Sequence, residues 1–296
     1  MSCRVCKKKL NKILSFGNFP VCHKFKKKNQ KEKKFNLEIG ICKKCSLVQL
    51  NNPFPLSQLR PKYNWINYNE PEEHLDKLVK TISNLKNINK SSIIAGVSYK
   101  EISTLERFKK IGYNKTWVLD VKKDLNINNK KLNLETIQDK ISKANTNKII
   151  KRNKKADVLI VRHILEHSYN TINFIQSLKK LVNDDGYLIF EVPDCKESFS
   201  SSDYTTIWEE HILYFTENSL KKMLIGQGLK ITYFEIYKYS YENVLIIITK
   251  IKKDNSPQKK INLIIPKINF NPNLLSVDKL KIRQKIEFFK KEKYKI

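Results

Sequence analysis

Four of the six cysteines form two Cys-x-x-Cys pairs in the first part of the chain. Cys3 pairs with Cys6, and Cys42 pairs with Cys45. Thiolates bind Zn²⁺ well, and each such turn presents two sulfurs to one tetrahedral ion. Two turns complete the coordination shell and leave no open position for catalysis, so we expect a structural zinc ion. Unligated cysteines or a redox pair are the alternatives.

The two remaining cysteines lie apart from these pairs. Cys22 is followed by His23, and this dipeptide could supply a replacement zinc ligand, although packed or loop residues are the simpler interpretation. Cys195 stands alone, and we expect it to be a neutral thiol at the edge of the core.

A cluster of titratable side chains occupies residues 162–167, RHILEH, directly after an apolar segment. His163, Glu166 and His167 can exchange protons near neutral pH. Open α/β sheets bind their ligands at the carboxyl ends of parallel strands, which is where this cluster would lie. The alternative is a solvated loop in which His167 caps the next helix.

A second cluster lies in residues 208–215, WEEHILYF. Glu210 precedes His211, and a carboxylate beside an imidazole raises the pKa of the histidine and orients it, a usual setting for a base. The surrounding aromatic side chains would exclude water. Alternatively, Trp208, Tyr214 and Phe215 pack a helix and the intervening residues form its polar face.

The signals for a nucleotide cofactor are weaker. Glycines after the first strand of such a sheet let the backbone approach the cofactor, and a helix N-terminus then meets its anionic group. The segment AGVSYKE offers Gly96 only. Asp120 ends the second strand, where an acid conventionally binds ribose hydroxyls. An ordinary strand-end carboxylate is the alternative for Asp120.

These residues are placed by an alternation of apolar strands and amphipathic helices. Helices separate the first strands, so we expect right-handed crossovers and a parallel sheet covered on both faces. The last two strands lie too close together for a crossover helix and should be antiparallel. The expected strands are residues 91–97, 116–121, 156–161, 187–193, 231–237 and 244–250, and the expected helices include residues 171–182 and 218–228. This α/β order resembles the Rossmann-like sheet of class I S-adenosylmethionine methyltransferases.

We divide the chain into four parts on this basis. They are a zinc-binding subdomain at 1–50, a Pro-containing linker and a helix at 51–90, a methyltransferase-like Rossmann domain at 91–250, and a basic tail with a terminal helix at 251–296.

The composition fits a folded protein with a strong positive charge. Of 296 residues 40% are hydrophobic, and the net charge is +29. Such a charge attracts nucleic acid or phosphorylated small molecules, but the lysines are spread over the whole length, so a nucleic-acid partner is less favoured. No apolar run approaches about 18 residues, so no membrane span is expected. With no signal-peptide pattern either, we expect a cytoplasmic protein.

Four elements together resemble a known family. The segments CRVC…CKKCSLVQL, LEH, FEVPD and EEHILYFT occur in this order over roughly residues 1–250. They resemble the zinc-containing C-methyltransferases of deoxysugar biosynthesis. That family methylates the carbon next to the ketone of a nucleotide-linked 4-keto sugar, after a base removes the α proton.

The resemblance implies roles for individual residues. His211 would be the base, Glu210 its partner and His167 a second acid/base group or substrate contact. The cofactor would be S-adenosylmethionine, bound by Gly96, Asp120 and His163. The acceptor would be an anionic nucleotide sugar, which suits a cation-rich chain.

The chain also departs from the family pattern. The cofactor loop has a single glycine, and Trp208 stands where a tyrosine is expected. The family has a further C-terminal domain, which another polypeptide could supply as a partner. These departures favour an alternative hypothesis, a catalytically inactive methyltransferase-like binding subunit. The charge and the zinc motif suggest a third, a zinc-ribbon nucleic-acid binder.

Overall fold

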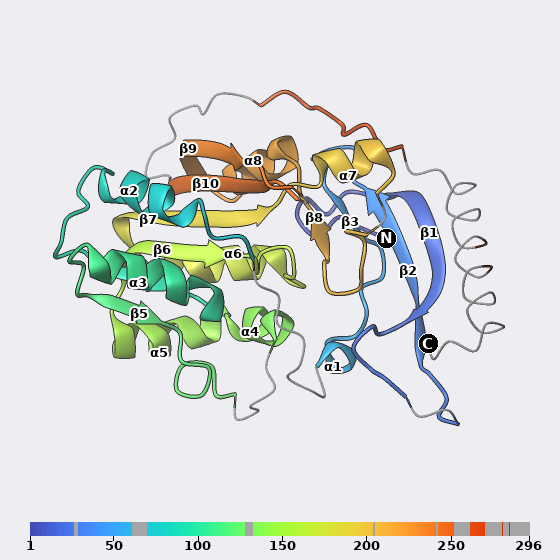
Figure 1. Cartoon of the computed structure of the whole chain (residues 1–296), viewed down its shortest axis with the longest axis horizontal. Coiled ribbons are helices and arrows are strands. Elements are labelled where there is room, and N and C mark those ends of the chain that lie inside the picture. The colour runs from blue at the N-terminus through green and yellow to red at the C-terminus, as the bar shows by residue number, and fades with distance from the viewer. Residues whose placement is uncertain are drawn as a thin grey trace.

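The computed structural model describes residues 1–26, 29–60, 70–127, 133–203, 205–240, 242–251, 261–269, 280 and 284. A large α/β unit and a smaller antiparallel sheet lie side by side (Figure 1). The expected terminal helix falls largely outside the described residues. Among the described residues, none of the helices combines the length and apolarity that a membrane crossing requires.

The large unit is built on a six-stranded mixed sheet with the order β5-β4-β6-β7-β10-β9. Strands β5, β4, β6 and β7 are parallel, as expected from their crossovers. β10 inserts between β7 and β9 and is antiparallel to both. The strands are β4 (Ile94–Gly96), β5 (Thr116–Val118), β6 (Ala156–Arg162), β7 (Val182–Pro193), β9 (Leu229–Tyr237) and β10 (Val244–Ile251). This is the predicted α/β class I methyltransferase fold.

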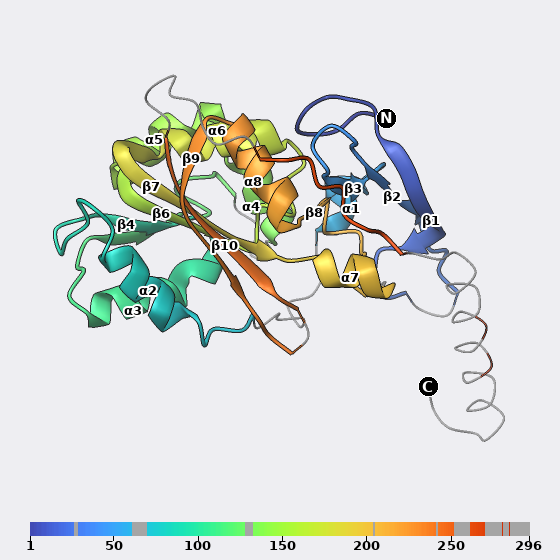
Figure 2. The ribbon, with the colours of Figure 1, turned by 90° about the horizontal axis from the view of Figure 1, so that it is seen from above.

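Helices cover both faces of this sheet (Figure 2). Side chains alternate between the two faces along each strand, so Val158 and Ile160 of β6 join one buried cluster, and Leu159 and Val161 join the other. One face is covered by α2 (Leu75–Ser83) and α3 (Ile102–Lys110), and the other by α5 (Lys143–Asn153), α6 (Thr171–Lys180) and α8 (Glu217–Gly226).

Several helices and strands differ from the expected ones in their presence or their boundaries. The segment before α5 holds an additional helix, α4 (Leu134–Lys140), and the serine run after β7 forms α7 (Lys196–Ser201). A 3₁₀ turn, η1 (Tyr99–Glu101), precedes α3. β7 begins five residues earlier than the predicted start at 187, because Val182 already pairs with Ala156 of β6.

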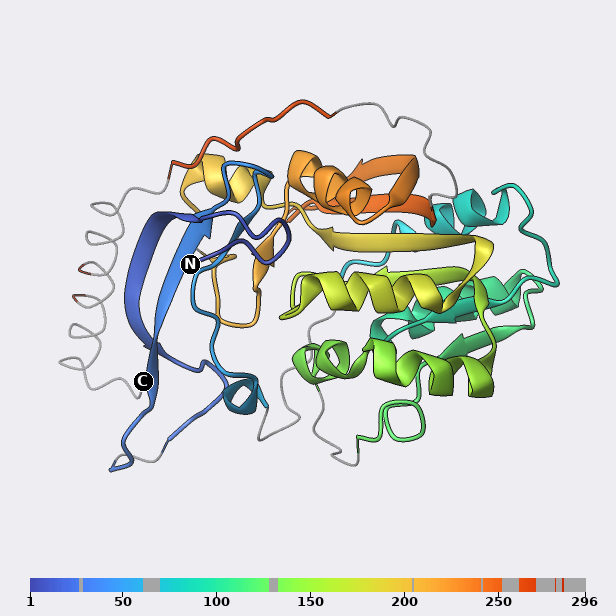
Figure 3. The same cartoon turned by 180° about the vertical axis from the view of Figure 1, so that it is seen from behind.

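The N-terminal unit is a four-stranded antiparallel sheet (Figure 3). β1 (Asn11–Pro20) and β2 (Lys34–Ile41) form an antiparallel hairpin. β3 (Val48–Leu50) pairs with β2, and β8 (Leu213–Tyr214) pairs with β3. The fourth strand therefore comes from the methyltransferase-like segment, next to His211. A short helix, α1 (Leu56–Leu59), follows β3.

Candidate functional site

The two Cys-x-x-Cys turns bring their four sulfurs together. The sulfurs of Cys3, Cys6, Cys42 and Cys45 all lie within 4.8 Å of one another. The Sγ–Sγ distance is 3.6 Å from Cys3 to Cys45, 3.3 Å from Cys6 to Cys42 and 3.8 Å from Cys6 to Cys45. A Zn–S bond of about 2.3 Å in a tetrahedron separates the sulfurs by about 3.8 Å. The expected zinc site therefore has the right donors at the right spacing.

Each turn has the same backbone design. Lys7 and Ser46, which directly follow the second cysteine of each pair, have positive φ angles of 59° and 65°. Their amides donate to the carbonyl of the first cysteine, Lys7 to Cys3 at 3.0 Å and Ser46 to Cys42 at 2.8 Å. The side chain of Gln49 donates to the Cys3 sulfur at 3.3 Å. Such outer hydrogen bonds orient metal ligands.

Cys22 and His23 do not join this cluster. Their metal-binding atoms group instead with a carboxylate oxygen of Glu209, and all three lie within 4.8 Å of one another. The interpretation of Cys22–His23 as substitute ligands for the N-terminal zinc is therefore wrong. Cys195 is buried and bonds through its backbone amide to Phe215. Burial raises the pKa of its thiol, as expected for a neutral cysteine.

Gly96, the glycine expected beside the cofactor, is in contact with Glu101. A β-carbon at position 96 would lie 2.5 Å from Cβ of Glu101. The Glu101 carboxylate is fully buried and accepts hydrogen bonds from the amides of Ser98 and Arg162, each at 2.7 Å. Burial outweighs these donors and raises the pKa of Glu101 to about 7. The space over Gly96 is thus filled by the protein's own side chain.

Asp120 lies just beyond β5, as expected, and is partly exposed. Its Oδ1 accepts hydrogen bonds from the amides of Lys122 and Lys123, at 3.0 and 2.9 Å. These amides, that of Lys123 first, lower the pKa of the Asp120 carboxyl. The carboxylate shapes its own turn, and its role toward a ribose stays a prediction.

A buried charge network occupies the ends of β6 and β7. Glu191 receives a bidentate bond from Arg162, at 2.8 and 2.9 Å, and contacts His163 Nε2 at 2.9 Å and His74 Nε2 at 3.1 Å. Although burial opposes ionisation, Arg162 and the two histidines hold the pKa of Glu191 well below its usual value. Burial favours the neutral form of His163, but Glu166 and Glu191 raise its pKa to about 10.

His167 and His211 meet at this edge of the sheet. Their ring centroids are 4.9 Å apart, edge to face, and one donor atom from each lies within 4.8 Å of a carboxylate oxygen of Glu166. His167 Nδ1 contacts Glu135 Oε1 at 2.5 Å. Burial favours a neutral ring, yet Glu135 raises the pKa of His167. Burial and the charges of His167 and His163 hold the pKa of His211 well below its usual value.

The two pKa shifts have opposite directions. Glu135 favours the charged form of His167, whereas burial favours the neutral form of His211, the form that can accept a proton. Both carboxylate oxygens of Glu166 are buried without a hydrogen-bond partner, and Glu166 itself is 2% exposed. Oε1 of Glu166 lies 3.7 Å from Nδ1 of His163, an ion-pair distance, so the carboxylate keeps capacity to accept hydrogen bonds.

Glu210 does not pair with His211, in contrast to the expectation. Its Oε1 lies 3.4 Å from Nδ1 of His23, in the N-terminal unit. The backbone places it there, because the amides of Ile212 and Leu213 donate to the carbonyl of Glu166, at 2.8 and 3.0 Å. The predicted rise in the pKa of His211 is therefore wrong, since Glu210 faces the other way.

Three carboxylates of this site escaped the sequence analysis. Glu101 ends the quoted segment AGVSYKE and completes a capping box with Ser98, a Ser-x-x-Glu signal that could have identified it,. Glu135 lies on α4, and the fold brings it to His167. Glu191 lies within the FEVPD segment, and a charged residue inside an apolar strand was a signal that could have identified it,.

Comparisons with known proteins identify two domains in this chain. Residues 3–59 match a family described as "Putative zinc binding domain", and residues 94–233 match one described as "Methyltransferase domain". The chain has a methyltransferase domain with an N-terminal zinc-binding domain. The methyltransferase domain thus covers the sheet from β4 into β9, including both histidine clusters.

One curated relative of this methyltransferase is the C-methyltransferase NovU of Streptomyces niveus. It is 22% identical over 235 residues, which cover 77% of this chain and 56% of NovU. The chain therefore spans little more than half the length of that relative.

Two solved structures are also similar to it. The 1,6-didemethyltoxoflavin-N1-methyltransferase of Burkholderia thailandensis is 8% identical, with a TM-score of 0.41 over 62% of this chain and 80% of that one. The N-methyltransferase NodS of Bradyrhizobium japonicum is 11% identical, with a TM-score of 0.39 over 62% and 97%.

Proposed function

We propose that the protein is an S-adenosylmethionine-dependent C-methyltransferase that acts on an anionic keto sugar linked to a nucleotide. One observation carries the proposal: the rings of His211 and His167 lie 4.9 Å apart at the edge of the sheet where such folds bind ligands, with the pKa of His211 lowered and that of His167 raised,. The relation to the C-methyltransferase NovU supports transfer to carbon.

The two histidines suit the two charges of an enolisation. His211 would remove the proton from the carbon next to the ketone, so that the C–H electron pair moves toward the carbonyl oxygen. His167, as an imidazolium, would stabilise the oxyanion that forms. Bound S-adenosylmethionine would supply an electrophilic methyl group. Glu166, whose oxygens accept no hydrogen bond within the protein, would accept one from a hydroxyl of the acceptor.

The residues available for the cofactor fit it in part. Asp120 is partly exposed at the end of β5, where it could accept hydrogen bonds from ribose hydroxyls,. Glu70 and Glu166 lie 4.0 and 3.7 Å from Nδ1 of His163, and Glu70 also pairs with Lys100 at 2.9 Å, so cations already balance these carboxylates. The crevice at Gly96 does not fit, because Glu101 fills it. That contact favours a second candidate function, a methyltransferase-like binding subunit without catalysis.

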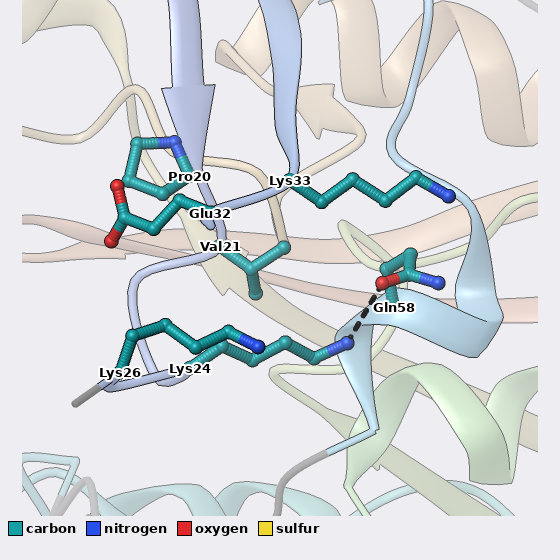
Figure 4. Close-up of a pocket in the computed structure, with 7 residues that line it drawn as sticks. All are labelled: Pro20, Val21, Lys24, Lys26, Glu32, Lys33 and Gln58. Carbon is teal, nitrogen blue, oxygen red and sulfur yellow. Dashed lines mark hydrogen bonds between the residues drawn. The ribbon is translucent and has the colours of Figure 1, made fainter. Parts of the chain in front are cut away.

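A basic cavity supports an anionic acceptor. It measures about 240 Å³ and lies between the end of β1 and α1. Lys24, Lys26 and Lys33 surround it (Figure 4), and Lys24 also donates to Gln58 at 3.0 Å. The same short loop carries His23, which contacts Glu210 beside His211. The loop that carries His23 would thus connect phosphates bound in this cavity to the segment that carries the proposed base.

Proton exchange tests the proposed base without requiring the complete reaction. The full chain is incubated in D₂O with nucleotide-linked 4-keto sugars and S-adenosylhomocysteine, and deuterium at the α carbon is measured by mass spectrometry. We expect wild-type exchange and a loss on the order of 10²–10⁴-fold in His211→Asn. Equal exchange in both proteins would refute His211 as the base. No exchange with any sugar would favour the binding subunit.

The cavity has its own test. Lys26→Ala and Lys33→Ala should raise the KM for the acceptor and leave kcat unchanged, because their contacts lie away from the reacting carbon. The exposed Lys43→Ala is the control. An unchanged KM in both cavity variants would remove the cavity from the acceptor site.

A further inference from the structure

A second group of metal-binding side chains lies where the N-terminal unit meets the loop of His211. The thiol of Cys22, a ring nitrogen of His23 and a carboxylate oxygen of Glu209 all lie within 4.8 Å of one another. Cys22 is exposed, while His23 and Glu209 are 7% and 5% exposed. None of the three belongs to the four-cysteine cluster.

The surroundings of His23 point to a cation. Its Nε2 lies 3.3 Å from the carbonyl oxygen of Arg60, which can only accept, so Nε2 carries a hydrogen. In the neutral ring the lone pair of Nδ1 then faces the carboxylate of Glu210 at 3.4 Å. Two acceptors that face each other need a proton or a metal ion between them. A metal-binding histidine commonly donates its other N–H to a carbonyl in this way.

The neighbouring acid is also held in position for binding. Oε1 of Glu209 accepts a hydrogen bond from the backbone amide of Cys22 at 2.7 Å, which fixes the carboxylate beside the thiol. Glu210 brings a second carboxylate to the ring of His23. One thiol, one imidazole and one carboxylate thus lie together as donors of the kind that Zn²⁺ takes up, and the carboxylate of Glu210 lies next to the imidazole,.

We propose that Cys22, His23 and Glu209 bind a second divalent metal ion such as Zn²⁺. Glu210 lies beside this group, 3.4 Å from Nδ1 of His23. The ion ties the loop after β1 to Glu209 and so fixes the backbone that leads to His211. The proposal does not rest on the proposed methyl transfer, because its three donors are not the histidines of that reaction.

Metal content decides between this site and a simple His23–Glu210 ion pair. The full chain is purified in the presence of zinc, and loosely bound metal is then removed. Inductively coupled plasma mass spectrometry gives the number of zinc ions per chain. We expect about two zinc ions per chain in the wild type, and about one in Cys22→Ser and in His23→Gln. Cys195→Ser, a buried cysteine outside both clusters, is the control and should keep two.

Cobalt substitution adds a signature of the ligands. Sulfur-to-cobalt charge transfer should decrease in Cys22→Ser, while the stronger absorption of the four-cysteine site remains. Circular dichroism shows whether each variant is folded. If Cys22→Ser is not folded, Glu209→Gln replaces it as the test variant. One zinc ion per wild-type chain, lost only in Cys3→Ser, would overturn the proposal and leave the ion pair.

Discussion

Glu135 on α4 binds Nδ1 of His167 at a distance of 2.5 Å. Both side chains are buried, at 1% and 5% exposure, so water screens the pair little. Although burial lowers it, the pKa of His167 is raised by Glu135, whereas burial lowers the pKa of the neighbouring His211. Glu135 thus contributes to the opposite pKa shifts of the two histidines.

Replacing Glu135 should change how the activity depends on pH. Glu135→Gln keeps the shape but removes the charge, so the pKa of His167 should fall. The alkaline limb of the kcat–pH profile should then move to lower pH, with little change in acceptor KM. Asp139→Asn, at an exposed position on the same helix, should leave the profile in place. An unshifted profile in Glu135→Gln would contradict the role of His167 as an imidazolium.

The contact between Gly96 and Glu101 should limit substitution at Gly96. Gly96→Ala places a methyl group 2.5 Å from Cβ of Glu101, and such overpacking should cost about 1–3 kcal/mol of unfolding free energy. Gly226→Ala is the matched control, since nothing lies within 4 Å of its added β-carbon. It should be neutral or stabilising. Urea unfolding gives the free energy of unfolding of both variants. Equal values would show that the Glu101 side chain can move away from the added methyl group at little cost.

The His163–Glu191 pair should make stability decrease at alkaline pH. The pKa of His163 rises from 6.5 to about 10 in the folded chain. A raised pKa of this kind contributes stability that is complete below pH 6.5 and is lost as pH rises through about 10. His163→Asn tolerates the positive φ of 46° at this position,.

Thermal unfolding from pH 6 to 10 checks this prediction. The difference in Tm between wild type and His163→Asn should be largest near pH 6 and should shrink toward pH 10. A difference that stays constant over this range would show that His163 is not charged in the folded protein.

Removing the N-terminal zinc should loosen the loop of His211. β8 follows that loop and pairs with β3, which follows Cys45. A Cys42→Ser variant should therefore show faster amide hydrogen exchange at Val48 and Tyr214, with β6 still protected. Cys195→Ser is the control. Unchanged exchange at β8 in the zinc-free variant would mean that the sheet is held without the metal.

Local spacing predicted part of this molecule well. The Cys-x-x-Cys turns and the apolar strand β6 are encoded by neighbours in sequence, so the zinc ligands and the sheet follow from short segments. The partner of Glu210 could not be predicted in this way. Glu210 is next to His211 in sequence, but its side chain can lie on either side of the backbone. The hydrogen bonds from Ile212 and Leu213 to Glu166 fix the backbone and thus the direction of that side chain.

The pairing of β8 with β3 was equally hidden. Two residues, Leu213 and Tyr214, form this strand, and a segment so short carries no period of its own. Its pairing depends on the N-terminal unit, more than 160 positions away along the chain.

Calorimetric titration of the full chain with S-adenosylhomocysteine tests the central claim most directly. The account predicts saturable binding at one site, with a Kd on the order of 1 μM to 1 mM. Binding should weaken about tenfold in Asp120→Asn, as expected for a lost hydrogen bond to a charged group. No saturable heat at millimolar ligand, with the protein folded and loaded with zinc, would contradict it and leave a binding subunit that has lost the cofactor.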